Sequence, residues 1–164
     1  MKKIHIMLVV LFAFAVVTCT SGVASALYPK YVGNTMVDLS WTQYESTDFS
    51  KYELYRDGSL IETIRARTVT FYRDTGLTKG QTYNYEIRSY YTTDKYRSDT
   101  TSATTGEVHG TITRDTTWTA ASSPYTLTEW DIRVRNGATL TIERGITVII
   151  SSYLCVQENG ALYA

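Results

Sequence analysis

The stretch LTKGQTYNYEI at residues 77–87 decides the fold of the first part of the chain. It holds a turn at Gly80, after which Tyr83, Tyr85 and Ile87 alternate with polar residues. Alternation with a period of two residues is typical of a strand that buries one of its faces. The stretch therefore predicts a turn that leads into a half-buried β-strand.

Further strands are expected on both sides of this stretch. Val37, Leu39 and Trp41 fall on one face of a strand that begins at Met36. The 14 Tyr residues of the chain also fit pleated strands better than helices. More strands are predicted over residues 52–55, 60–64, 68–72 and 98–105, with a hairpin turn at Arg56-Asp57-Gly58. Short strands at regular spacing predict an all-β fold, with a β-sandwich over residues 27–106.

These residues resemble a fibronectin type III domain. Trp41 matches the Trp that fills the core of that family, and the run Tyr52–Tyr55 matches its third strand. Leu77, Gly80 and Tyr83 match the tyrosine corner, in which a Tyr hydroxyl bonds back to the backbone. Only residues 27–32 remain for the first strand, so we expect that edge to be short or irregular. The resemblance implies a structural core that contains Trp41, Leu54, Leu77, Tyr83 and Ile87.

A different regularity follows Gly106. The segment IRVRNGATL at residues 132–140 is repeated, with changes, as LCVQENGAL at residues 154–162. This repeat aligns Ile132 with Leu154, Val134 with Val156, and Leu140 with Leu162. A period of about 20–25 residues, with short strands and Gly turns, predicts a β-solenoid whose coils stack on one another.

The stretch from Ile112 through Trp118 and Pro124-Tyr125, followed by the run GATLTIERGITV at residues 137–148, resembles the start of a right-handed parallel β-helix in large bacterial and archaeal cell-surface proteins. Arg144 stands where that motif usually has Pro. The resemblance implies the first one to two coils of an incomplete β-helix over residues 107–164, the N-terminal piece of a larger protein. Because the last coil lacks a neighbour, we expect residues 27–106 to fold alone and residues 107–164 not to.

Residues 1–26 have the pattern of a secretory signal peptide. Lys2 and Lys3 precede an apolar run from Ile6 to Val17, and the segment ends in Ala24-Ser25-Ala26. The run is too short to span the roughly 30 Å hydrocarbon core of a bilayer. We expect cleavage after Ala26 and a secreted or cell-surface location, with membrane contact only during export. The alternatives are an uncleaved anchor and a lipoprotein modified at Cys19.

The sequence offers no convincing catalytic constellation. After residue 26, His109 is the only His and Cys155 the only Cys, which supports neither a zinc site nor a nucleophile–His pair. The alignment of the repeat places Asp131 over Tyr153 and Arg133 over Cys155, so no ladder of carboxylates is expected. We therefore predict a protein that is not an enzyme, with no catalytic, cofactor-binding or metal-binding residues and no cofactor.

Three interpretations of the function remain. The first is a non-catalytic secreted or cell-surface modular protein, a spacer or adhesion unit whose partners are other surface proteins or cell-envelope polysaccharide. The second is the non-catalytic front of a carbohydrate-active β-helix enzyme. The third is a carbohydrate-binding module, in which Tyr90, Tyr91 and Tyr96 stack on sugar rings, although such residues more often cover a sheet face. Equal numbers of basic and acidic residues, 16 each, predict no nucleic-acid partner.

Overall fold

The computed structural model describes residues 26–127, 132–151, 153–157 and 159–164. Apart from Ala26, the predicted signal peptide lies outside the described residues. The described chain is all-β, as predicted, and its one helical element is the short 3-10 turn η1 (Ala120–Ser122). No helix in these four ranges is long and apolar enough to cross a membrane.

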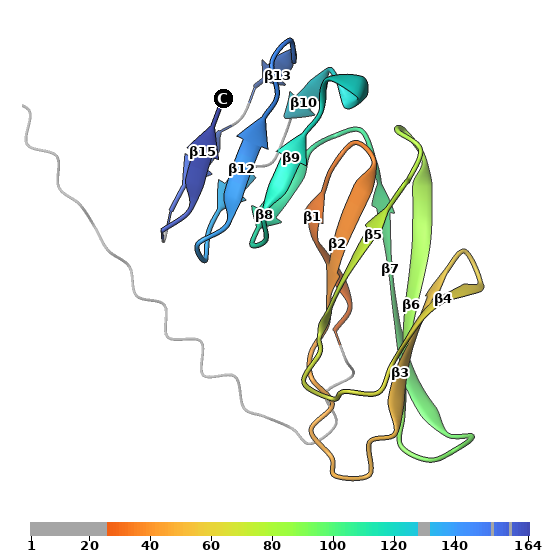
Figure 1. Cartoon of the computed structure of the whole chain (residues 1–164). Coiled ribbons are helices and arrows are strands. Elements are labelled where there is room, and N and C mark those ends of the chain that lie inside the picture. Colours follow the sequence, from red (N-terminus) through yellow and green to blue (C-terminus); the bar gives the residue numbers. More distant parts are fainter. Residues whose placement is uncertain (1–25, 128–131, 152, 158) are drawn as a thin grey trace, which may run out of the picture.

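A sandwich of two sheets forms the first part of the molecule (Figure 1). One layer has the strand order β4-β3-β6-β7, and the other contains β1, β2 and β5. All pairings within these two layers are antiparallel. The strands are β1 (Tyr28–Val32), β2 (Met36–Ser40), β3 (Lys51–Arg56), β4 (Ser59–Ile64), β5 (Phe71–Thr75), β6 (Thr82–Tyr90) and β7 (Tyr96–Thr104).

The alternation read from the sequence decides which side chains enter the sandwich core. Along β6, Tyr85, Ile87 and Ser89 are buried, while the residues between them face outward. The predicted hairpin turn lies between β3 and β4, where Asp57 and Gly58 both have positive φ. The first strand is irregular, as expected, because its register with β2 shifts between Pro29 and Tyr31.

Parallel coils form the second part of the molecule. The first coil contains β8 (His109–Ile112), β9 (Thr116–Trp118) and β10 (Tyr125–Leu127). The second contains β11 (Ile132–Val134), β12 (Thr139–Ile142) and β13 (Val148–Ile150), and the third begins with β14 (Leu154–Val156) and β15 (Ala161–Tyr163). Each strand pairs in parallel with its counterpart in the next coil.

The stacking register agrees with the sequence repeat. Ile132 pairs with Leu154, and Leu140 pairs with Leu162, which confirms the alignment read from the sequence. The same spacing extends back to the first coil, where Ile132 pairs with Gly110. The structure thus adds one coil, β8 to β10, ahead of the two segments that the repeat revealed.

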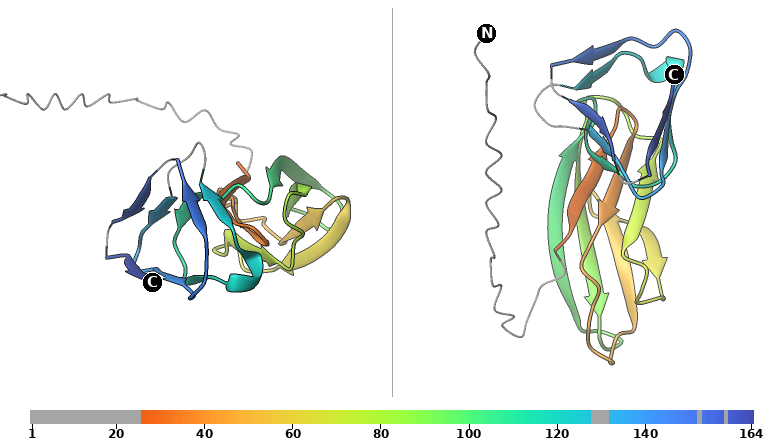
Figure 2. Two further views of the ribbon diagram at one scale, coloured as in Figure 1. Left: turned by 90° about the horizontal axis from the view of Figure 1, so that it is seen from above. Right: turned by 90° about the vertical axis from the view of Figure 1, so that its left-hand side faces the viewer.

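The two parts share one sheet. Strand β1 pairs with β2 on one side and, antiparallel, with β8 on the other, so the six-stranded order is β14-β11-β8-β1-β2-β5. Figure 2 shows the coils continuing from this layer of the sandwich when the molecule is seen from above. The predicted domain limit at residues 106 and 107 falls between β7 and β8, and no break in the sheet accompanies it.

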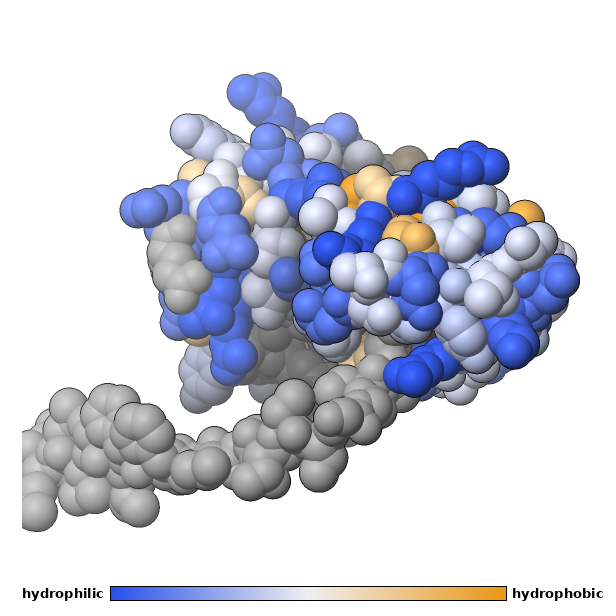
Figure 3. Space-filling model, turned by 90° about the horizontal axis from the view of Figure 1, so that it is seen from below, coloured by the Kyte–Doolittle hydropathy of each residue, from blue (hydrophilic) through white to orange (hydrophobic). Residues whose placement is uncertain are grey.

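Each part nevertheless has its own apolar core. Val37, Leu39 and Tyr52 belong to the sandwich core, and Ile112, Trp118 and Leu127 belong to the coil core. Two sandwich residues join the coil core instead: Tyr31 of β1 is buried in it, and Met36 of β2 packs against it. The underside of the molecule, shown in Figure 3, is mainly hydrophilic with isolated apolar residues.

Candidate functional site

The residues predicted as the structural core lie between the two layers of the sandwich. Trp41, Leu54, Leu77 and Ile87 are all buried in the same cluster. The Trp41 ring meets the Tyr52 ring edge-on, with 5.7 Å between centroids. These side chains fill the interior and leave no surface on which a ligand could sit.

Tyr83 has a different position from the other four predicted core residues. It is half-buried at the margin of the core, and its hydroxyl accepts a hydrogen bond of 2.9 Å from the backbone N–H of Thr78. Its ring lies 5.6 Å from the guanidinium of Arg56. The side chain must reach the sheet edge to make this backbone bond, so it closes the corner without filling the centre.

Sequence reasoning missed a buried polar group beside Tyr83. The Tyr85 hydroxyl donates to Asp74 at 2.8 Å, and Arg56 donates to both oxygens of the same carboxylate. Burial, followed by the bond to Asp74, raises the pKa of Tyr85 well above its ordinary value. Tyr85 is two residues before Ile87, so strand alternation could have predicted that it points inward. Its bond to Asp74, on another strand, could not be predicted from local sequence.

The three predicted ligand contacts are not brought together. Tyr90 and Tyr96 pair across β6 and β7 on the outer face of the sandwich, with ring centroids 5.0 Å apart. Tyr91 follows the end of β6, outside the strand, and Tyr44 is its electrostatic neighbour. The structure therefore offers Tyr90 and Tyr96, without Tyr91, as a surface pair.

Charged side chains interleave with these rings on the same outer face. Arg88 lies 4.1 Å from the Tyr55 ring and 5.0 Å from the Tyr96 ring, and Lys51 lies 4.6 Å from the Tyr90 ring. Glu86 holds Arg88 through two bonds of 2.8 and 2.9 Å. We call this set the outer-face ladder: Lys51, Glu53, Tyr55, Glu86, Arg88, Tyr90 and Tyr96.

Glu53 joins the ladder at its other side. It accepts hydrogen bonds from Lys51 at 2.6 Å and from the Tyr55 hydroxyl at 2.7 Å. The bond to Glu53, together with burial, raises the pKa of Tyr55 to about 12. Burial alone would raise the pKa of Glu53, but the bonds from Lys51 and Tyr55 outweigh it and lower that pKa. The ladder is thus a set of mutually bonded groups on the outer face of the sandwich.

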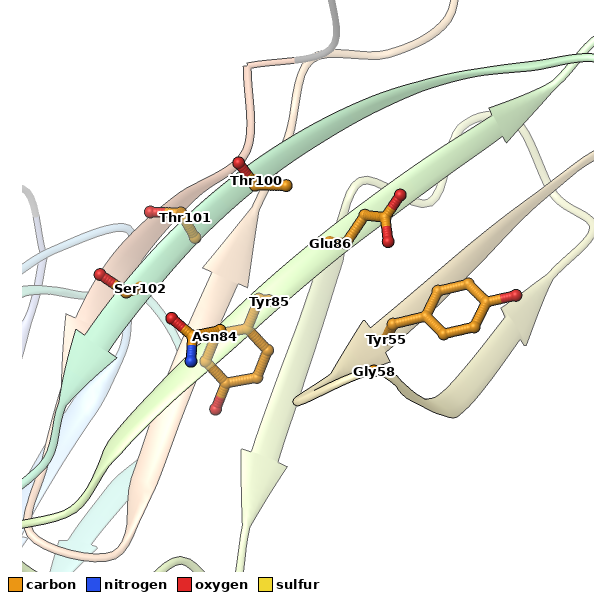
Figure 4. Close-up of a pocket in the computed structure, with 8 residues that line it drawn as sticks. All are labelled: Tyr55, Gly58, Asn84, Tyr85, Glu86, Thr100, Thr101 and Ser102. Atoms are coloured by element: carbon orange, nitrogen blue, oxygen red, sulfur yellow. The ribbon is translucent and has the colours of Figure 1, made fainter.

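A shallow pocket of about 450 Å³ adjoins the ladder (Figure 4). Tyr55 and Glu86 line it from β3 and β6, and Thr100 and Ser102 line it from β7. Asn84 adds a side-chain amide, which lies 3.3 Å from Asp57. Hydroxyl and amide groups beside aromatic rings are suited to hydrogen bonding with sugar hydroxyls.

The titratable residues singled out in the sequence stand apart from this face. Nδ1 of His109 lies 2.9 Å from the carbonyl oxygen of Glu107, and Cys155 is a half-buried free thiol in the row of Arg133. Asp131 lies outside the described residues. No group of three or more His, Cys, Asp or Glu residues that could hold a metal occurs in the described ranges.

Comparison with curated proteins identifies two relatives of a short segment. Chitinase C of Streptomyces lividans and chitinase 63 of Streptomyces plicatus are each 35% identical over 65 residues, which is 39% of this chain. The chain spans only 10% of the length of either chitinase. No protein-family model matches the chain.

Several solved structures have a partial likeness to this chain. The central fibronectin-III array of RIM-binding protein has 20% identity and a TM-score of 0.40, over 49% of this chain and 34% of that one. Pectate lyase PelI from Erwinia chrysanthemi, in complex with tetragalacturonic acid, has 16% identity and a TM-score of 0.40, over 84% and 54%. A family 28 exopolygalacturonase of Yersinia enterocolitica has 10% identity and a TM-score of 0.41, over 74% and 33%.

The fold assignment rests on the strand pairings of the chain itself. Two antiparallel layers enclose one core, and parallel strands stack in register around another. The chain is an all-β protein in which a fibronectin type III-like sandwich continues, through one shared sheet, into the coils of a parallel β-helix.

Proposed function

We propose that this chain is a non-catalytic module of a secreted or cell-surface protein, in which the sandwich caps the first coil of a β-helix and holds it at a fixed angle. The observation that carries the proposal is the pairing of β1 with β8. A solenoid coil needs a neighbour on each side for its backbone bonds and its apolar core. Strand β1 pairs with β8 of the first coil, and its Tyr31 side chain adds to the apolar core of that coil.

Tyr31 supports this capping role most directly. It is 1% exposed within the coil core, and its hydroxyl accepts a 3.0 Å hydrogen bond from Nε1 of Trp118. The Trp118 ring stacks on the Tyr125 ring with centroids 4.7 Å apart. A side chain of the sandwich thus closes the end of the coil interior.

Polar contacts around Tyr31 fix the orientation of the two parts. Nδ2 of Asn34 donates to the carbonyl oxygens of Ser122 and Pro124, at 2.5 and 3.0 Å. Arg73 contacts Thr116 at 3.1 Å while it is held by two bonds to Asp38. These contacts, together with the burial of Tyr31 in the coil core, favour a rigid spacer over a flexible tether.

Gly110 offers a sharp test of the cap. A Cβ at this position would collide with the carbonyl oxygen of Lys30 on β1, and its φ is +99°. Gly145 has a similar positive φ of +80° but open space around it, so it controls for backbone strain alone. We expect Gly110→Ala to accelerate amide exchange throughout residues 132–142, whereas Gly145→Ala does not. Equal effects of the two variants would argue against the cap.

Export is the other part of the proposal. The predicted signal peptide places the mature N-terminus at Leu27, and N-terminal sequencing of secreted material tests this. A lipid-modified start at Cys19 would replace it with the lipoprotein interpretation. The non-catalytic part fails if the secreted chain releases reducing or unsaturated ends from chitin or polygalacturonate.

A second candidate function is carbohydrate binding by the outer face of the sandwich. The pairing of Tyr90 with Tyr96 beside the polar pocket favours it, and the similarity to a segment of two chitinases agrees with a carbohydrate-related module. Binding to chitin that falls in a Tyr90→Ala, Tyr96→Ala variant, but not in Tyr91→Ala, would support this candidate. The remaining interpretation, the front of a carbohydrate-active β-helix enzyme, requires an active face on coils other than those described.

A further inference from the structure

A second concave surface lies across the junction, on the outward face of the shared sheet. It is a groove of about 290 Å³ between β1 on one side and β8 with the end of β11 on the other. The groove exists because β1 pairs with β8, with Tyr31 opposite Gly110. The close approach of Gly110 to the Lys30 carbonyl brings the two walls together.

The charged groups that line this groove are both cationic. Lys30 comes from the sandwich wall and Arg135 from the coil wall. Nε of Arg135 donates to Oε1 of Gln157 in the next coil at 3.1 Å, which fixes the direction of the guanidinium along the sheet. Arg133, earlier in the same segment on β11, is exposed on the same outward face. Among the described residues that line the groove, none carries a carboxylate.

The other lining groups match the chemistry of a sugar. Tyr28 presents a ring that is 47% exposed, and Thr111, Thr113 and Asn136 present hydroxyl and amide groups. Aromatic rings offer an apolar face to a pyranose, hydroxyls and amides bond to its hydroxyl groups, and Arg and Lys make charge-assisted bonds to a carboxylate.

We propose that this groove binds a carboxylated glycan, a polymer built from uronic acid residues, across the junction of sandwich and coils. The open shape fits a segment of a chain that runs on past both walls better than it fits a small enclosed molecule. Lys30 and Arg135 hold carboxylates, and Tyr28 lies under a sugar ring. This site is separate from the outer-face ladder, which belongs to the other layer of the sandwich.

The test measures the affinity of the full chain for hexamers of galacturonic acid, mannuronic acid and guluronic acid. Chitohexaose serves as the neutral probe and a glycerol phosphate polymer as the phosphate probe. At least one carboxylated hexamer should bind, and its affinity should fall as salt rises from about 50 to about 500 mM because charge pairing is screened. The Lys30→Ala, Arg135→Ala variant should lose at least about tenfold in affinity.

The matched control is Arg65→Ala, Lys95→Ala, which removes two exposed cations from loops of the other layer and should bind like the unaltered chain. Amide exchange over residues 82–90 reports whether each variant is folded. The proposal is overturned if no carboxylated hexamer binds, if the Lys30, Arg135 variant binds as tightly as the control, or if the neutral or phosphate probe binds at least as well. These outcomes leave the capping role untouched, since Gly110→Ala tests that separately.

Discussion

The coil next to the sandwich and the coil farthest from it differ in the solvent exposure of their inward apolar residues. One inward row runs through Ile112, Val134 and Val156, which are 0%, 0% and 44% exposed in the first, second and third coils. A second row shows the same change, since Leu140 is 0% exposed and Leu162 is 41%. The end that meets the sandwich is buried, and the opposite end is open.

This difference teaches that burial in the coils depends on position in the stack more than on residue type. Leu140 and Leu162 are the same residue in the same row, and only the presence of a further neighbour separates them. Apolar surface contributes roughly 25 cal/mol for each Å² removed from water. The last coil therefore gains less from folding than the coils before it. The large apolar side chains exposed in it are Tyr153, Val156, Leu162 and Tyr163, and Ile149 and Ile150 are exposed on β13 of the second coil.

The largest effect is expected from a variant that unfolds the sandwich, because the first coil should then lose its buried end as well. Trp41→Ala leaves a cavity where a buried ring packed, at a cost of roughly 3–5 kcal/mol, out of about 5–15 kcal/mol typical of a domain. Since β1 caps the first coil, we expect the coils to lose protection with the sandwich. Amide exchange should accelerate over both residues 82–90 and residues 132–142.

Trp41→Phe is the graded control, because it keeps an aromatic ring and should cost less than the Ala variant. A Trp41→Ala melting temperature within one or two degrees of the unaltered chain would contradict the packing seen here. Coils that stay protected while the sandwich unfolds would contradict the capping role instead.

A matched pair of Leu variants measures the difference between the coils directly. Leu140→Ala should destabilise the protein by about 2–5 kcal/mol, the range for a buried Leu. Leu162→Ala should change stability by less than about 1 kcal/mol, because that side chain already meets solvent. Urea unfolding of both variants provides the measurement, and equal losses would mean that the last coil is buried by association in solution.

Repetition explains why the coil register could be predicted from sequence. Strands stacked in parallel repeat their inward residues at a spacing of one coil. The matching apolar residues Ile132 and Leu154 therefore predict their own pairing. The first coil does not show in the internal repeat because Gly110 occupies the position of Ile132 and Leu154. Gly110 lies close to the Lys30 backbone, and a glycine there adds no apolar side chain to the repeating pattern.

The junction and the surface sites show where local sequence stops being informative. Tyr31 lies on β1, but its burial in the coil core depends on β8, which comes after all the other strands of the sandwich in the chain. The sequence groups Tyr90, Tyr91 and Tyr96 as ligand contacts, and the structure pairs Tyr90 with Tyr96 across two strands. Arg88 meets the rings of Tyr55 and Tyr96 only through the pairing of β6 with β3 and β7.

The capped end can be weakened by removing a single oxygen atom. Tyr31→Phe leaves Nε1 of Trp118 buried without its acceptor, which costs about 1–3 kcal/mol. Tyr28→Phe removes a hydroxyl from an exposed residue of the same strand and should change stability by less than about 0.5 kcal/mol. Chemical denaturation measures the free energy of unfolding of the two variants. An unchanged free energy in Tyr31→Phe would mean that the hydroxyl contributes nothing to the cap.

The smallest expected effect is on the ionisation of Tyr55 in the outer-face ladder. Unlike the open coil end, this exposed sheet face has side chains that hydrogen-bond to one another. Tyr55 has its pKa raised from 10.0 to about 12 by the bond to Glu53 and by burial, so folding favours the neutral phenol. Its contribution to stability is complete below pH 10 and is lost as the pH rises from about 10 to about 12. A tyrosinate absorbance titration should show that Tyr55→Phe removes a late-ionising group, whereas Glu53→Gln shifts that group to lower pH. A Tyr55→Phe chain that instead loses a group ionising near pH 10 would mean that the ladder does not hold its hydroxyl, and that the face is open to a ligand.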